Sequence, residues 1–90
     1  MIPYIVEFLG TFFFLLVILR TKEPWAIAIG LLAVIYLFQS VSGAHFNPAV
    51  SVMMTINKTL EMAKLPFYIL AQILGGVSAF YFNKFISKNT

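Results

Sequence analysis

The stretch Ser42-Gly43-Ala44-His45-Phe46-Asn47-Pro48-Ala49-Val50 places the signals of a helix start inside a strongly apolar sequence. Asn is favoured just before a helix and Pro suits the first helical position, so a helix is predicted to begin at Pro48. Its first N–H groups and the positive end of its dipole then lie at membrane depth. Lipid offers these groups no hydrogen bonds, so the backbone must line a polar cavity or be buried in protein. The stretch therefore predicts a pore or a substrate site within a membrane.

The composition is that of an integral membrane protein. Of 90 residues, 61% are hydrophobic and 10% are charged, and the mean hydropathy is +0.95. A soluble domain carries about 25% charged residues. The apolar residues form three runs, at 2–19, 25–41 and 65–82, and each is close to the roughly 20 residues that cross a hydrocarbon core. We therefore expect residues 1–90 to form one membrane-embedded unit without a separate soluble domain.

Four prolines mark where the helices are expected to begin. Each stands just ahead of an apolar segment, where its missing N–H costs nothing. They are Pro3, Pro24, Pro48 and Pro66. The predicted spans are about 3–19, 24–41 and 65–84, with a short helix at about 48–57, roughly 15 Å long and half of a roughly 30 Å hydrocarbon core. The predicted fold is an all-α membrane protein with three transmembrane helices and one re-entrant half-helix.

Small residues on the third predicted span favour close helix packing. Ala71, Gly75 and Ala79 repeat every four residues, a spacing that lets membrane helices approach each other closely. Such spacing also arises by chance in alanine-rich spans, so it is weaker evidence than the prolines.

The sequence argues against several other classes of protein. The net charge of +3 comes from lysine and arginine at the ends of the apolar runs, which is typical of interface anchoring rather than of nucleic-acid binding. There is no cysteine, and the single histidine, His45, has only Glu7 as an acidic residue within the spans, so no metal and no cofactor are expected. Ser42 and Ser51 have no Asp and no basic residue near them, so neither a hydrolytic triad nor enzymatic activity is expected.

Polar side chains at membrane depth need a partner or a function. Glu7 either lies in the headgroup region near the amino terminus, or faces inward and accepts hydrogen bonds from backbone N–H groups of residues 42–46. Gln72, near the middle of the third span, carries a donor and an acceptor and can serve the same loop. His45 is expected to be buried, neutral and hydrogen-bonded within the loop. We interpret Glu7 and Gln72 as braces that need not touch a permeant.

Asn47 has the clearest predicted role in the loop. Its side-chain oxygen is expected to accept a hydrogen bond from the free N–H groups of the helix, which leaves its NH₂ group facing the cavity. A fixed donor at the positive end of a half-helix orients water by its oxygen and opposes cations, including protons. Gly43 and Ala44 have no bulky side chains, so their carbonyl oxygens can form a row of polar groups along an otherwise apolar wall.

These motifs resemble a known family. The stretch 42–51 resembles the signature of the aquaporin and glycerol-facilitator family, the major intrinsic proteins. Glu7-Phe8-Leu9-Gly10-Thr11 resembles the family's first-helix pattern, and Tyr68-Ile69-Leu70-Ala71-Gln72 with Gly75 resembles its third. The resemblance covers nearly the whole chain and corresponds to the first half of a family member. A complete member is an inverted repeat of two such halves, whose half-helices meet at mid-membrane.

The resemblance implies a role for each residue of the motif. The meeting point of the two half-helices is implied to be Asn47, Pro48 and Ala49. The carbonyls along the pore are implied to come from Gly43, Ala44 and His45. The implied pore-lining residues are Asn47, Pro48, Ala49, Gly43, Ala44 and His45. Glu7 and Gln72 are implied to brace the loop.

The resemblance also bears on selectivity. The family's outer filter uses an Arg directly after the second motif, whereas Val50 follows the one motif of this chain. An aromatic residue of the second helix is usual in the filter, and the aligned position here falls near Ile27, which is aliphatic. A constriction at Ile27 and Val50 is therefore expected to be permissive and to tolerate glycerol.

Two hypotheses for function follow. The first is a passive channel for water and small neutral polyols such as glycerol, formed by antiparallel homodimers that are gathered into four pores. The second is a non-conducting half-aquaporin, or a truncated product, that needs a full-length or complementary aquaporin-like chain. The basic residues number two on the amino-terminal side and four on the other. This weak bias fits either insertion in both orientations or a single orientation opposite to that of the family's first half. The lipid bilayer is the remaining expected partner.

Overall fold

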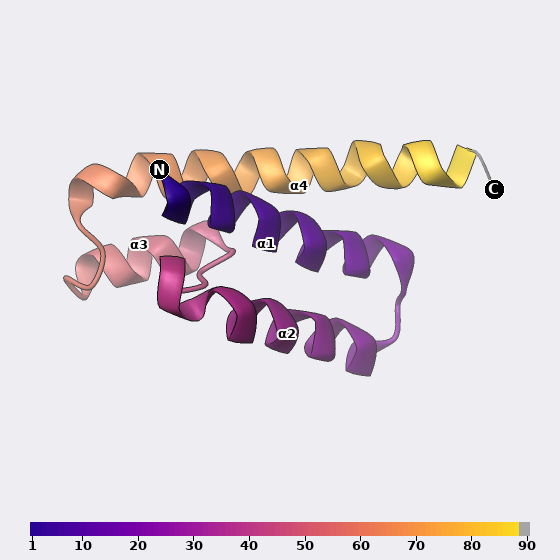
Figure 1. Ribbon diagram of the computed structural model, residues 1–90, viewed down its shortest axis with the longest axis horizontal. Helices are drawn as coiled ribbons and strands as arrows, with labels where there is room; N and C mark the ends of the chain where they lie inside the picture. Colours follow the sequence, from indigo (N-terminus) through magenta and orange to yellow (C-terminus); the bar gives the residue numbers. More distant parts are fainter. Residues whose placement is uncertain (89–90) are drawn as a thin grey trace.

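The computed structural model describes residues 1–88, and within that range the chain folds into four α-helices. They are α1 (Ile2–Arg20), α2 (Pro24–Ser42), α3 (Pro48–Ile56) and α4 (Leu65–Lys88), and a short 3-10 turn, η1 (Met62–Lys64), precedes α4. α1 lies between α2 and α4, and the short α3 lies at one end of the bundle, in contact with α4 (Figure 1). Three of these helices are long and apolar enough to cross a membrane. The protein is therefore an all-α integral membrane protein with one helix that is too short to span.

The helices begin where the prolines predict. Pro24 and Pro48 occupy the first positions of α2 and α3, while Pro3 and Pro66 occupy the second positions of α1 and α4. A proline in the first turn removes an N–H that has no partner within the helix and fixes a φ that suits the helix. The prolines therefore favour a helix start at each of these four places through the local sequence alone.

The last helix is longer than the sequence analysis predicts. α4 continues to Lys88, four residues beyond the expected end near 84. Arg20, at the end of α1, donates hydrogen bonds to Asn83 Oδ1 (3.3 Å) and to Ser87 Oγ (3.2 Å). No proline or glycine follows Gly76, so nothing in the sequence stops the helix. The lysines of this segment mark the membrane interface rather than the end of the helix.

Small residues let α4 approach α1 closely. Ala71, Gly75 and Ala79 are all buried. A Cβ atom on Gly75 would lie 2.7 Å from the carbonyl oxygen of Phe8 and 3.1 Å from the Cβ of Thr11. α4 therefore rests directly on the backbone of α1, as the four-residue spacing predicts.

Gly75→Ala is expected to destabilise the protein, because the added methyl group meets backbone atoms that cannot move aside. Overpacking of this kind costs typically about 1–3 kcal/mol. Gly76→Ala is the matched control, because its Cβ would meet Leu15 Cδ1 at 3.0 Å, the end of a flexible side chain. Thermal unfolding midpoints in detergent micelles compare the two variants with the parent. Equal midpoints for the two variants would contradict the close approach of α4 to α1.

Candidate functional site

The loop between α2 and α3 reverses the chain within residues 43–47 and uses a strained backbone to do so. Gly43 ends α2 with a φ of 87°, and both Ala44 and Phe46 have a φ of 54°. A left-handed backbone costs roughly 1–2 kcal/mol for a residue with a Cβ atom. Gly10 makes room for the loop, because a Cβ there would overlap the ring of Phe46. The surroundings must therefore supply the interactions that hold this conformation.

Glu7 supplies most of these interactions. Its side chain is fully buried, and its carboxylate accepts four hydrogen bonds. The backbone N–H groups of His45 (3.0 Å) and Phe46 (2.8 Å) donate two of them. Ser42 Oγ (2.6 Å) and Gln72 Nε2 (2.9 Å) donate the other two. Of the two positions considered for Glu7, the structure shows the inward one, in which the carboxylate ties α1 to the loop and to α4.

A second set of hydrogen bonds fastens the loop to the first turn of α3. Gln72 Nε2 also donates to Ser51 Oγ (2.8 Å), and Ser51 Oγ bonds His45 Nδ1 (2.8 Å). Because Ser51 accepts from Gln72, its own proton is available for His45 Nδ1, which suits a neutral imidazole with its proton on Nε2. Tyr68 Oη donates to the carbonyl oxygen of Ser42 (2.8 Å). Gln72 therefore reaches the loop through Glu7 and Ser51 rather than through the loop backbone.

Sequence reasoning missed three members of this network. Ser42 and Ser51 are considered there only as nucleophiles, and the network uses their hydroxyls as hydrogen-bond relays. Tyr68 lies near a span end in the sequence, but its side chain is buried, with 4% exposed. One signal was available for Ser51, which follows Asn47 by four residues and so lies one helical turn above it.

Asn47 caps α3 through its side chain. Asn47 Oδ1 accepts a hydrogen bond from the backbone N–H of Ala49 (2.8 Å), and the residue itself is exposed. In the described structure the NH₂ group of Asn47 has no partner. An exposed donor therefore stands at the positive end of α3 in a fixed orientation.

The structure brings most of the predicted motif together and leaves one residue apart. Gly43, Pro48 and Ala49 are exposed, Ala44 and Val50 are half-buried, and His45 is buried. Ile27 lies in the first turn of α2. It precedes Gly43 by sixteen residues, so at 1.5 Å per residue it is about 24 Å away along the helix. A constriction at Ile27 would therefore be separate from the Asn47 region.

A groove of 420 Å³ runs beside Asn47 between α1 and α4. Asn47 and Pro48 line one end, and the rest is mostly apolar, with Phe14 and Val77 among its walls. At its edge stand two buried oxygens, Thr11 Oγ1 and Gln72 Oε1. Neither has a hydrogen-bond partner within residues 1–88. This chain does not enclose the groove.

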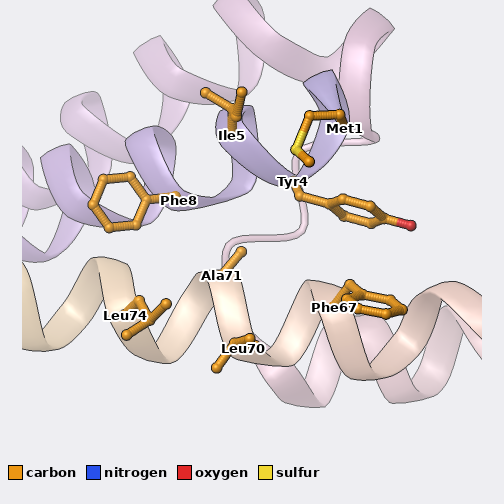
Figure 2. A pocket seen from close by; sticks show the side chains of 8 residues that line it. All are labelled: Met1, Tyr4, Ile5, Phe8, Phe67, Leu70, Ala71 and Leu74. Atoms are coloured by element: carbon orange, nitrogen blue, oxygen red, sulfur yellow. The ribbon is translucent and has the colours of Figure 1, made fainter.

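A second groove, of 330 Å³, lies between the starts of α1 and α4 and is apolar (Figure 2). Its lining residues are Met1, Tyr4, Ile5, Phe8, Phe67, Leu70, Ala71 and Leu74. The Tyr4 hydroxyl points away from the apolar side chains in Figure 2. This groove therefore lacks the polar groups that would guide a polar solute.

No group of three His, Cys, Asp or Glu side chains among residues 1–88 is placed to hold a metal ion. The site consists instead of hydrogen-bond donors and acceptors fixed by helices on three sides. Together they define a class of membrane protein in which the flanking spans hold a half-helix at membrane depth. The chain belongs to the major intrinsic protein family, because the sequence profile described as Major intrinsic protein matches residues 2–90.

The similarity of this chain to individual relatives is consistent with this family. The chain is similar to the glycerol uptake facilitator protein-like 6 of Lactiplantibacillus plantarum, with 44% identity over 87 residues that cover 84% of this chain and 39% of the relative. It is 48% identical over 59 residues to the glycerol uptake facilitator protein of Pseudomonas aeruginosa, covering 61% and 21%. It is 32% identical over 90 residues to aquaporin PIP1-6 of Zea mays, covering 81% and 30%. No solved structure matches the chain significantly. The chain thus spans less than half the length of these relatives.

Glu7→Gln is expected to destabilise the loop strongly. The amide keeps the size of the side chain but turns one of two accepting oxygens into a donor, which then faces the donors that oxygen had served. A buried donor left without an acceptor costs roughly 1–3 kcal/mol. The exposed Glu23 has no side-chain bond at the start of α2, so Glu23→Gln is the matched control. Unfolding in mixed micelles gives both free energies, and an equally small loss for both variants would contradict the bracing role.

Proposed function

We propose that this chain forms one half of a passive channel for water and small neutral polyols such as glycerol, completed by a second copy inserted in the opposite orientation. The observation that carries the proposal is the state of Asn47. Its oxygen is held by Ala49 N–H, its NH₂ group has no partner in the described structure, and the residue is exposed at the positive end of α3. This is the geometry of a donor that receives the oxygen of a passing solute.

The carbonyl groups ahead of Asn47 support the same function. Gly43 is exposed and Ala44 is half-buried, and the positive φ of Ala44 keeps the backbone out of a helix. Backbone groups outside regular structure are tolerated at membrane depth where they line a polar path. We assign the carbonyls of residues 43–45 to that path, with His45 held by Ser51. Solutes would then exchange hydrogen bonds with water for hydrogen bonds with the loop.

The partner has to supply the missing wall of the groove at Asn47. A two-fold axis in the membrane plane at the depth of Asn47 places the half-helix of a second copy opposite the first. The positive ends of both half-helices then face the middle of the path, which opposes cations. The distribution of lysine and arginine permits this arrangement, because two of these residues lie on one side of the chain and four on the other, which is a weak bias.

The open constriction favours glycerol as well as water. Ile27 is aliphatic and half-buried, and Val50 stands where an Arg would follow the second motif of a complete family member. Neither side chain adds a charge or a bulky ring. Two of the relatives described above are named glycerol uptake facilitators, which supports the same permeant.

A second candidate function is a half-channel that conducts only with a different chain. The chain covers 39% of the length of its Lactiplantibacillus plantarum relative, so a longer or complementary chain of the family could provide the second half-helix. This candidate has a single orientation and no transport by the purified chain. The two candidates therefore differ in outcomes that can be measured directly.

Liposomes that contain only the purified chain are expected to shrink faster than empty liposomes in stopped-flow light scattering after a hyperosmotic step. Asn47→Leu should bring the rate close to that of empty liposomes, because it removes the donor at the middle of the path. Asn57→Leu is the matched control, since Asn57 lies at the outer end of the same helix and bonds Thr59. Permeability of the parent chain equal to that of empty liposomes would exclude conduction by this chain alone.

Cysteine labelling tests the orientation, because the chain has no native cysteine. Thr21→Cys and Thr59→Cys place one thiol on each side without changing any charge. The antiparallel pair predicts that a membrane-impermeant maleimide labels about half of each variant from outside sealed vesicles. Full labelling of one variant and protection of the other would show a single orientation and favour the second candidate.

A further inference from the structure

The ends of α1 and α4 carry most of the positive charge of the chain. Arg20 ends α1 and Lys22 follows it, while Lys84 and Lys88 lie in the last two turns of α4, which continues past the end of α1 (Figure 1). Glu23 is the one acidic residue of this part of the sequence, so four positive charges stand against one negative charge. None of these residues lines the groove at Asn47. The proposed path therefore leaves this charge without a role.

Arg20 is held in place by neutral groups, which leave its charge uncompensated. Its Nη1 donates hydrogen bonds to Asn83 Oδ1 (3.3 Å) and Ser87 Oγ (3.2 Å), both on α4. Its Nε and Nη2 have no partner among residues 1–88. The one ion pair within that range joins Lys64 to Glu61, before the start of α4. A guanidinium carries its N–H donors in a planar fork that matches the oxygens of a phosphate, so Arg20 presents an oriented fork that lacks an anion.

The length of α4 places this end of the bundle at a membrane surface. The apolar run 65–82 corresponds to about 27 Å of helix, close to a hydrocarbon core of roughly 30 Å. With Lys64 at the headgroups of one leaflet, Asn83 therefore reaches the headgroups of the other. Trp25, in the first turn of α2, is 66% exposed at the same end, and Tyr81 is 61% exposed. Aromatic residues of this kind are typical of a membrane surface, so the basic side chains stand level with lipid phosphates.

The side chain one turn below the lysines of α4 is apolar and exposed. Phe80, Lys84 and Lys88 follow each other at intervals of four residues, so they share one face of the helix. Phe80 is 52% exposed and lies on the membrane side of Lys84. This face therefore changes from apolar to basic at the level of the headgroups. A molecule with an acyl chain and an anionic head meets both parts of the face, whereas a soluble polyanion meets the basic part alone.

We infer that this end of the bundle binds an anionic phospholipid, whose phosphate lies between the free fork of Arg20 and the ammonium groups of Lys84 and Lys88. Asn83 and Ser87 each directly precede one of these lysines, so their bonds to Arg20 hold it at the same turns of α4. Contacts between Arg and phosphate through two N–H groups are strong and directional. Four basic residues at a membrane surface attract lipids of net negative charge, whereas a zwitterionic headgroup also presents a cation.

The lipid site does not rest on conduction. A chain that conducts by itself and a chain that needs a different partner both keep Arg20 on α4. Permeability reports on the path at Asn47, and lipid binding reports on this end of the bundle. A failure of either proposal can therefore be told from a failure of the other.

Fluorescence quenching by brominated lipids tests which lipid is bound. Trp25 is the only tryptophan of the chain, so Phe80→Trp in a Trp25→Phe background places a single reporter one turn below Lys84. The vesicles consist of phosphatidylcholine with a small fraction of brominated phosphatidylglycerol or of brominated phosphatidylcholine. Phosphatidylglycerol is expected to quench more strongly at low salt, and added salt should weaken this preference. Equal quenching by the two lipids would overturn the inference, and so would displacement by soluble glycerol phosphate.

Charge-removing variants of the reporter chain identify the residues that bind the lipid. Arg20→Gln is expected to lower the preference for phosphatidylglycerol about fivefold, the contribution of one basic residue near an anionic surface. Lys84→Gln combined with Lys88→Gln should also lower it. These two side chains have no partner among residues 1–88, so their replacement leaves the fold intact, which thermal unfolding checks. Lys58→Gln, the matched control, removes the same charge at the opposite membrane surface and should keep the preference. An equal loss in all variants, or no loss in the first two, would refute the inference.

Discussion

The fully buried carboxylate of Glu7 is the interaction on which the rest of the structure depends. A re-entrant loop exposes backbone N–H groups where lipid offers no acceptor, and a charged carboxylate is itself costly there. The structure offsets both costs in one place, since Glu7 accepts hydrogen bonds from two loop N–H groups and from two side chains. The carboxylate stands on α1, the central helix. The position of the loop is therefore fixed by the packing of the spans and not by the loop sequence alone.

The orientation of α3 follows from this anchor. With Phe46 held by Glu7, Asn47 adopts the extended backbone of a cap and Pro48 begins the helix. Ser51, one turn later, is fixed by Gln72 and His45. The first turn of α3 is thus held by α1 and α4, so the helix dipole points at a defined place near mid-membrane. A loose half-helix would carry the same dipole, but its field would not favour one position for a solute.

The sequence predicts the elements well because prolines and apolar runs act locally, and all four helices begin within one residue of the expected positions. The expectation that Glu7 faces inward also follows from a local argument about cost, although the sequence left the headgroup position open. The features of the site that the sequence could not predict depend on contacts between residues that are far apart in the chain. The positive φ of Ala44 and Phe46 is imposed by Glu7 and Gly10, and no property of these residues favours it. Tyr68 belongs to the site because the packing of α4 against α1 places its hydroxyl within hydrogen-bond distance of the carbonyl oxygen of Ser42.

The groove at Asn47 restricts how a second copy could complete the proposed path. A two-fold axis in the membrane plane maps each depth on one side of the axis onto the same distance on the other side, so only a residue at the depth of the axis meets its own counterpart. Asn47 stands at the inner end of α3, and Asn57 stands at its outer end. An axis at the depth of Asn47 therefore brings the two Asn47 side chains together and keeps the two Asn57 side chains on opposite faces.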